Sequence, residues 1–221
     1  QIMVTGNPAF DRMAAPSVPK EVLFKRLGLD VQKKTLLFAP QQINKFSTFW
    51  SDDLFYVMAK KIVEAVRHLS NVQLIIKADP YEALEPYQKL TQVCDVAVAV
   101  QQIPMVELLY HSDLLITLDS TAALEAMIFC KPVIIFNLTK RRSRVMYAEE
   151  SAALGVRAPS QVGVAISQII EDHGGVRQSM AEAQQGFVRR YAGQIDGQAT
   201  ERMASLIHHH MMSVSGTLGR F

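Results

Sequence analysis

Short runs of consecutive apolar residues alternate along this chain with stretches that carry apolar residues at helical spacing. Four such runs are TLLFA (35–39), VQLIIK (72–77), DLLITL (113–118) and VIIF (133–136). Apolar residues in the middle of these runs do not alternate with polar ones, which is typical of strands covered on both faces. The pattern therefore predicts an α/β fold: a Rossmann-like, doubly wound parallel sheet with right-handed crossovers.

The segments between the runs have the three-to-four-residue spacing of amphipathic helices. We expect a fifth strand at 95–100 and a short strand at 2–5, before the breakers Pro16 and Pro19. The expected helices lie at about 20–27, 52–69, 82–93, 104–111, 119–130, 160–172, 176–191 and 198–211.

Composition excludes several classes of protein. The 221 residues are 49% hydrophobic, which is enough to bury a core, and the net charge of +2 gives no bulk electrostatic attraction to nucleic acid. No run reaches the ~18 consecutive apolar residues of a membrane span. Cys94 and Cys130 lack metal-ligand spacing, so we expect a reducing, cytoplasmic compartment. The histidines at 208–210 point about 100° apart on a helix and cannot face one metal ion.

Polar segments follow the carboxyl ends of the expected strands, where doubly wound sheets bind ligands. These segments are 40–48, 77–81, 119–125 and 137–144. The residues that we expect to line a cleft there are Pro40, Gln41, Lys45, Asp79 and Asn137.

The strand at 113–118 turns into a helix through Asp119, Ser120, Thr121 and Ala122. Small side chains leave the backbone N–H groups of a first turn accessible, and the helix dipole favours a phosphate there. Asp and Ser are also ordinary N-cap residues, so the sequence leaves phosphate binding and simple capping both open.

Charged residues near this turn are interpreted either as ligand-binding residues or as ordinary solvated surface residues. Glu125 is the only charged residue between Ser120 and Cys130, and it does not fit a capping box. Lys77, Arg141 and Arg142 follow expected strands and could neutralise phosphate charge, or could be solvated surface residues.

Several segments together resemble a known group of enzymes. They are VTGNPAFD (4–11), TLLFAPQ (35–41), IKADP (76–80) and LLITLDSTAALEAMIFCKPVIIFN (114–137). The chain resembles nucleotide-sugar enzymes of GT-B architecture, a group with UDP-N-acetylglucosamine 2-epimerase, the CDP-glycerol glycerophosphotransferases and bacterial surface-polysaccharide glycosyltransferases.

The resemblance implies two Rossmann-like domains that face a cleft. It implies that residues 31–221 form the nucleotide-sugar-binding domain with its closing helices. Residues 1–30 would be a loosely attached interdomain segment from the end of an N-terminal domain that is missing here, with the strand at 2–5 pairing with that domain. The fragment would then be inactive alone.

The resemblance also assigns roles to residues. The turn of Ser120, Thr121 and Ala122 would meet the diphosphate, with Lys77, Arg141 and Arg142 nearby, and Glu125 would meet the ribose hydroxyls. No metal or other cofactor is implied, and the catalytic residues stay unassigned. A dimer, and peripheral membrane association of the full-length enzyme at the inner face of the membrane, remain open.

Three departures bear on the choice within the group. Asp79 precedes Pro80 where many relatives carry His, Cys130 stands where a glycine is common, and the turn of 120–122 is poorer in glycine than the turn of the epimerases. They favour an inverting-type, metal-independent glycosyltransferase, displacing its donor's nucleotide at the anomeric carbon, over an epimerase acting on a UDP-sugar. A nucleotide-binding domain without chemistry is the third alternative.

Overall fold

The computed structural model describes residues 3–13, 17–40, 52–92, 94–139, 143 and 145–218. Its strands are β1 (Lys34–Ala39), β2 (Val72–Lys77), β3 (Ala97–Val100), β4 (Leu114–Thr117), β5 (Val133–Phe136) and β6 (Leu154–Val156). Its α-helices are α1 (Lys20–Leu27), α2 (Asp52–Val66), α3 (Glu85–Gln92), α4 (Met105–His111), α5 (Ala122–Ile128), α6 (Val162–Ile170), α7 (Val176–Tyr191) and α8 (Ala199–Leu218). Three short 3₁₀ helices are η1 (Pro8–Arg12), η2 (Pro159–Gln161) and η3 (His173–Gly175).

The strands form one six-stranded sheet in the order β3-β2-β1-β4-β5-β6, and every neighbouring pair is parallel. The predicted doubly wound parallel sheet is therefore confirmed. The strand order reverses between β1 and β4, because the first three strands progress to one edge and the last three to the other. The strand β6 was not predicted, since three residues that include Gly155 leave no recognisable pattern.

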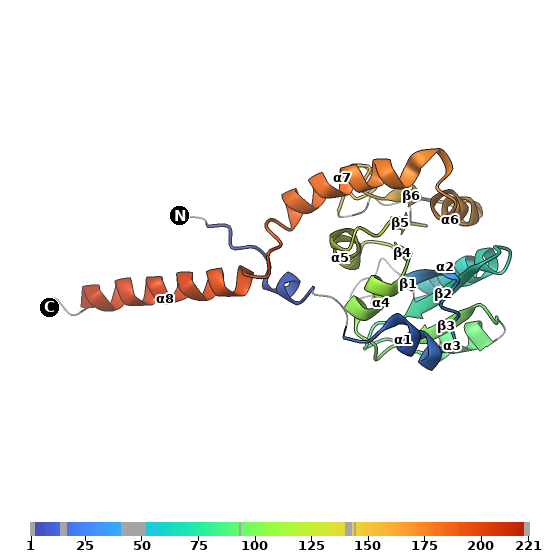
Figure 1. Ribbon diagram of the computed structural model, residues 1–221, viewed down its shortest axis with the longest axis horizontal. Coiled ribbons are helices and arrows are strands. Elements are labelled where there is room, and N and C mark those ends of the chain that lie inside the picture. Colours follow the sequence, from blue (N-terminus) through green and yellow to red (C-terminus); the bar gives the residue numbers. More distant parts are fainter. Residues whose placement is uncertain are drawn as a thin grey trace.

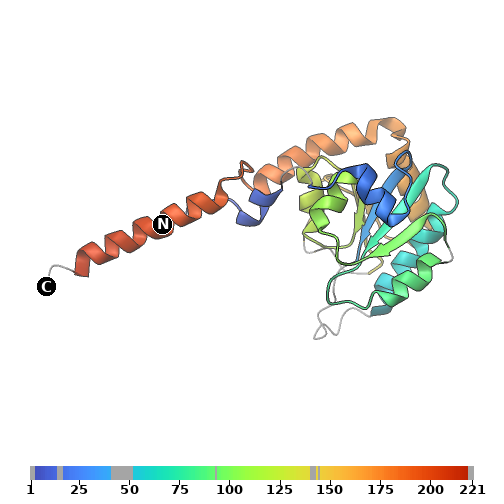
Figure 2. The same ribbon diagram turned by 60° about the horizontal axis from the view of Figure 1, so that its bottom comes forward.

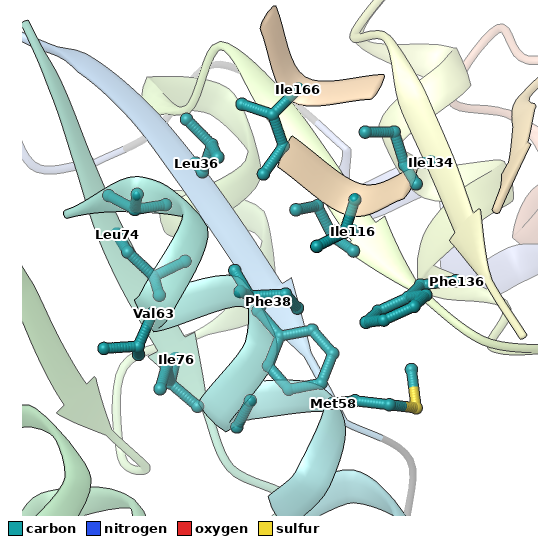
Figure 3. Packing of buried hydrophobic residues seen from close by; sticks show 14 of the residues in the cluster. Leu36, Phe38, Met58, Val63, Leu74, Ile76, Ile116, Ile134, Phe136 and Ile166 are labelled. Carbon is teal, nitrogen blue, oxygen red and sulfur yellow. The ribbon is translucent and has the colours of Figure 1, made fainter. Parts of the chain in front are cut away.

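Both faces of the sheet are buried, as the uninterrupted apolar runs indicate (Figure 1). Along β1, Leu36 and Phe38 belong to a core with α2, α3 and α6, whereas Leu37 and Ala39 belong to a second core with α1, α4, α5 and α7. Figure 3 shows the first core, where Phe38 lies among side chains from the strands and from α2 and α6. Alternate residues of one strand thus fill opposite layers, which is why the run 36–39 is apolar at every position.

The helix α1 packs on the sheet and is not a loosely attached segment. Its residues Leu23 and Phe24 are buried in the second core. The backbone N–H of Asp30 donates to Oε1 of the buried Gln73 at 2.9 Å, and Nε2 of Gln73 donates to the Asp30 carbonyl at 2.7 Å. The expectation of a loose attachment up to residue 30 is therefore wrong for residues 17–30.

A buried carboxylate holds the chain just before α1. One oxygen of Glu107, on α4, accepts from the backbone N–H of Ser17 at 2.9 Å and from its hydroxyl at 2.6 Å. These hydrogen bonds hold the pKa of Glu107 below its usual value. An ionised, hydrogen-bonded carboxylate therefore joins residues 90 positions apart in the sequence.

Replacing this carboxylate should make the stability less dependent on pH. We expect Glu107→Gln to lower the free energy of unfolding at pH 7. Because the pKa of Glu107 is lowered by folding, the stabilisation is present above the unfolded pKa and is lost as the pH falls through the folded value. Urea unfolding of both proteins from pH 7 to pH 3 should show the difference shrinking. Glu85→Gln, which removes an exposed pair with Lys89, should change little.

Residues 3–13 lie beside α8 and not on the sheet (Figures 1 and 2). The carboxylate of Asp11 accepts from the backbone N–H groups of Ala199 at 3.0 Å and Thr200 at 2.7 Å, so it caps α8. Nε of Arg202 donates to the Thr5 carbonyl at 2.8 Å. Residues 3–5 form no strand, so the strand expected at 2–5 is wrong for the part described.

The end of α5 explains a departure noted in the sequence. Cys130 has φ of 54°, in the left-handed region that favours glycine. The N–H of Cys130 bonds to the Met127 carbonyl at 2.9 Å and the N–H of Lys131 to the Ala126 carbonyl at 2.9 Å, which is a Schellman motif. Cys130 thus occupies the position after a helix where glycine is usual.

Candidate functional site

A pocket lies at the carboxyl ends of the strands where the strand order reverses. Here Oγ1 of Thr117 donates to the Ala39 carbonyl at 2.8 Å and joins the ends of β4 and β1. The pocket has a volume of about 400 Å³. Pro40, Lys77, Asp79 and Ser120 come together in its lining, with Ala39, Ala78, Pro80, Gln101, Gln102, Ile103, Pro104 and Met105.

Ser120 lies at the start of α5, next to the N-cap residue Thr121, as the sequence predicts. The Ser120 hydroxyl accepts from the N–H of Ala122 at 3.2 Å, and the Ser120 carbonyl accepts from the N–H of Ala123 at 3.1 Å. Thr121 is exposed and makes no side-chain capping hydrogen bond. The turn is thus compact, and small side chains leave its outer side accessible.

Glu125 is half-buried on the first turn of α5. Burial raises the pKa of its carboxyl group. Within the described part of the chain, no hydrogen bond or ion pair is found for this carboxylate. A partly desolvated carboxylate without a partner is costly, so a ligand that donates hydrogen bonds to it would be favoured. Neither Glu125 nor Thr121 lines the pocket described above.

Lys77 is almost completely buried, with 7% of its surface exposed. Its Nζ donates to the carbonyl of Ala78 at 3.0 Å and of Gln101 at 2.7 Å, and burial lowers its pKa. Nε2 of Gln101 in turn donates to the carbonyls of Asp79 at 2.7 Å and Glu82 at 2.8 Å. Lys77 therefore joins the loops after β2 and β3, and that network fixes one wall of the pocket.

Asn137 is buried, and its Oδ1 accepts from the backbone N–H of Thr139 at 2.9 Å and from its hydroxyl at 2.6 Å. The amide thereby shapes the chain after β5. The remaining predicted residues, Gln41, Lys45, Arg141 and Arg142, lie outside the described residues.

Sequence reasoning missed Tyr147 and gave Asp119 no role of its own. Tyr147 is buried, and its hydroxyl donates to the Ser120 carbonyl at 3.3 Å. Oδ1 of the buried Asp119 accepts from the N–H of Val145 at 3.4 Å. Asp119 carried a signal, since it directly follows a strand, but Tyr147 sits in a short apolar run (145–148) between polar segments, too short to show any periodicity.

The described ranges of the chain contain neither a candidate metal site nor a candidate membrane span. Groups of three or more His, Cys, Asp or Glu that could hold a metal ion are not found there. None of the helices in those ranges is both long and apolar enough to cross a bilayer.

A doubly wound parallel sheet with a pocket where the strand order reverses defines the class of Rossmann-like α/β domains, and the arrangement is similar to that of GT-B proteins. The chain belongs to the CDP-glycerol:poly(glycerophosphate) glycerophosphotransferase family, whose model matches residues 1–209. The resemblance to the GT-B group that includes the CDP-glycerol glycerophosphotransferases is therefore confirmed. No curated protein matches the chain.

Solved structures with the same fold include three relevant ones. A variant of the wall teichoic acid polymerase TagF with CDPG has a TM-score of 0.66 and 19% identity, covering 96% of this chain and 51% of TagF. The S. aureus MnaA–UDP co-structure has a TM-score of 0.62 and 20% identity, covering 94% and 54%. A putative UDP-N-acetylglucosamine 2-epimerase from Listeria monocytogenes has a TM-score of 0.62 and 16% identity, covering 95% and 54%. The chain thus spans about half the length of these proteins.

Proposed function

We propose that this chain is the donor-binding half of a transferase of the GT-B class that builds a bacterial surface polymer from a nucleotide-activated donor. The observation that carries the proposal is the family match over residues 1–209, which includes the whole sheet and its pocket. The name of the family points to CDP-glycerol as the donor.

With CDP-glycerol the chemistry is a phosphoryl transfer. An acceptor hydroxyl oxygen forms a bond to the β-phosphorus, and the bond from that phosphorus to the bridging oxygen breaks. CMP leaves with the electron pair, and the glycerophosphate unit joins the acceptor. Displacement at an anomeric carbon applies instead if the donor is a nucleotide-sugar. No residue of this chain is assigned as the base that takes the acceptor's proton.

The chain's own residues would hold the nucleotide. In this proposal the turn of Ser120, Thr121 and Ala122 meets the diphosphate, where the N-terminal end of α5 is favourable for negative charge. Glu125 accepts from the ribose hydroxyls, which supplies a partner that its half-buried carboxylate does not find among the described residues. The pocket adds an apolar wall of Ile103, Pro104 and Met105 that suits a planar base.

Basic residues and cleft-lining residues complete the assignment. Arg141 and Arg142 follow β5 and would neutralise phosphate charge. Lys77 would contribute positive charge to the pocket while it clamps the adjacent loops. Gln41 and Lys45 would line the cleft.

The second half of the enzyme would dock on α8. This helix extends away from the sheet with residues 3–13 beside it (Figure 2). Met203, Ile207 and Met211 recur at four-residue spacing and are exposed, as are Met3 and Val4. An apolar face of this kind favours burial against another domain. We therefore propose that the chain before α1 connects to an N-terminal acceptor domain, whereas residues 17–30 pack on the sheet of this domain. As a separate proposal, the enzyme works at the inner face of the membrane.

Nucleotide titration of the chain tests this proposal. We expect CDP and CDP-glycerol to bind more tightly than UDP, with an increase in melting temperature, because a ligand that binds only the folded state stabilises it. The chain alone should not turn over CDP-glycerol. Selective binding of UDP and UDP-N-acetylglucosamine would favour the epimerase alternative, which the similarity to the Listeria monocytogenes epimerase and to the MnaA–UDP co-structure supports. Binding of neither nucleotide would refute the proposal, and binding without turnover in a full-length enzyme would favour a non-catalytic domain.

A further inference from the structure

The start of α5 depends on a side chain that is distant in sequence. Tyr147 is 2% exposed, and its hydroxyl reaches the Ser120 carbonyl from 27 residues further along the chain. Burial and the nearby carboxylates of Asp119 and Glu125 raise the pKa of Tyr147 to about 12. The hydroxyl therefore stays protonated and remains a hydrogen-bond donor across the physiological pH range.

The local capping of α5 is weak. The helix has only seven residues, and its N-cap residue Thr121 makes no side-chain hydrogen bond to the first turn. The Ser120 carbonyl accepts from Tyr147 in addition to the N–H of Ala123. A tertiary hydrogen bond from a rigid side chain thus adds to the local capping that the hydroxyl of Ser120 provides.

The Tyr147 ring is itself held in place. Its centroid lies 5.1 Å from that of the buried Phe187, on α7, and Phe187 stacks on Tyr191 at 4.3 Å. The three rings form a row that links α7 to the start of α5. A hydroxyl at the end of such a row has little freedom to move away from the Ser120 carbonyl.

We propose that Tyr147 is a positioning residue for nucleotide binding, which fixes the Ser120 turn in the orientation that receives the diphosphate. The inference rests on the proposed function, because the turn has to be the diphosphate site. Tyr147 does not touch the ligand and acts through the backbone of Ser120.

The test compares two tyrosines of the same aromatic row. Tyr147→Phe keeps the ring and removes the hydroxyl that reaches the turn. Tyr191→Phe keeps its ring and removes a hydroxyl that donates to Glu150 at 2.8 Å, away from the turn. We measure CDP affinity by calorimetry, and amide hydrogen exchange of the free proteins in peptides that cover 120–128 and, as a reference, β2.

Tyr147→Phe should weaken CDP binding about threefold to tenfold, the range for the loss of one neutral hydrogen bond. Exchange should be faster over 120–128 and unchanged over β2, and Tyr191→Phe should match wild type in both measurements. Unchanged CDP affinity in Tyr147→Phe would overturn the inference while leaving the proposed function intact, and so would faster exchange throughout the sheet. A wild-type protein that binds neither CDP nor UDP would refute the proposed function and this inference with it.

Discussion

Phe24→Ala should lower the free energy of unfolding by about 3–5 kcal/mol, the usual cost of removing a buried phenylalanine from a core. Phe24 is completely buried in the core formed by α1, α4, α5 and α7. Its ring meets His111 edge-on at 6.4 Å, and Nζ of Lys20 lies 5.0 Å above it. The cavity would open between α1 and the sheet, and urea unfolding at pH 7 measures the loss.

The matched control is on the same helix. Val22 is 41% exposed, so Val22→Ala should change the unfolding free energy by no more than about 0.5 kcal/mol. A similarly small effect of Phe24→Ala would mean that α1 is only loosely attached and that the domain begins near residue 31. The expected large effect instead moves the beginning of the folded unit to residue 17, where Ser17 meets Glu107.

The sheet could be predicted from the sequence because its strands carry a local signal. The predicted ranges 72–77 and 133–136 are the observed bounds of β2 and β5. In both, every residue is buried, so the run of apolar side chains is itself the consequence of helices on both faces. The location of the pocket followed from the same reasoning, because parallel strands bring their carboxyl ends to one edge.

Contacts between distant residues could not be predicted this way. The helix α1 is a short segment in which only half of the residues are apolar, and its attachment depends on Gln73 and Glu107, far along the chain. Lys77 looked like a phosphate ligand because it ends a strand, yet its hydrogen bonds go to backbone carbonyls. Tyr147 contacts Ser120 although α5 and β5 lie between them in the sequence. The hydrophobic periodicity of a single segment gives no information about such pairings.

Glu125→Ala should weaken nucleotide binding by ~1.5–3 kcal/mol, about tenfold or more in affinity, if Glu125 accepts hydrogen bonds from the ribose. Hydrogen bonds from two hydroxyls to a carboxylate are charge-assisted, so they are stronger than neutral ones. Titration of both proteins with CDP and UDP measures the effect. Glu125→Gln, which keeps the shape but not the charge, should bind with intermediate affinity. Glu201→Ala, on the exposed first turn of α8, should bind like wild type.

Removing the charge of Glu125 should weaken nucleotide binding but should not lower the free energy of unfolding. Burial raises the pKa of this carboxyl group, so the ionised form is disfavoured in the folded state and reduces stability at neutral pH. Glu125→Gln should therefore unfold at the same urea concentration as wild type or a higher one, while it binds nucleotide less tightly. In wild type, nucleotide affinity should fall as the pH drops through the raised pKa, because only the ionised carboxylate accepts from both hydroxyls. Equal affinities of Glu125→Ala and wild type would instead make Glu125 an ordinary side chain at the edge of α5. Binding-site residues often reduce the stability of the free protein. For Glu125, the unfavourable desolvation of the carboxylate would be offset when the ribose hydroxyls donate hydrogen bonds to it.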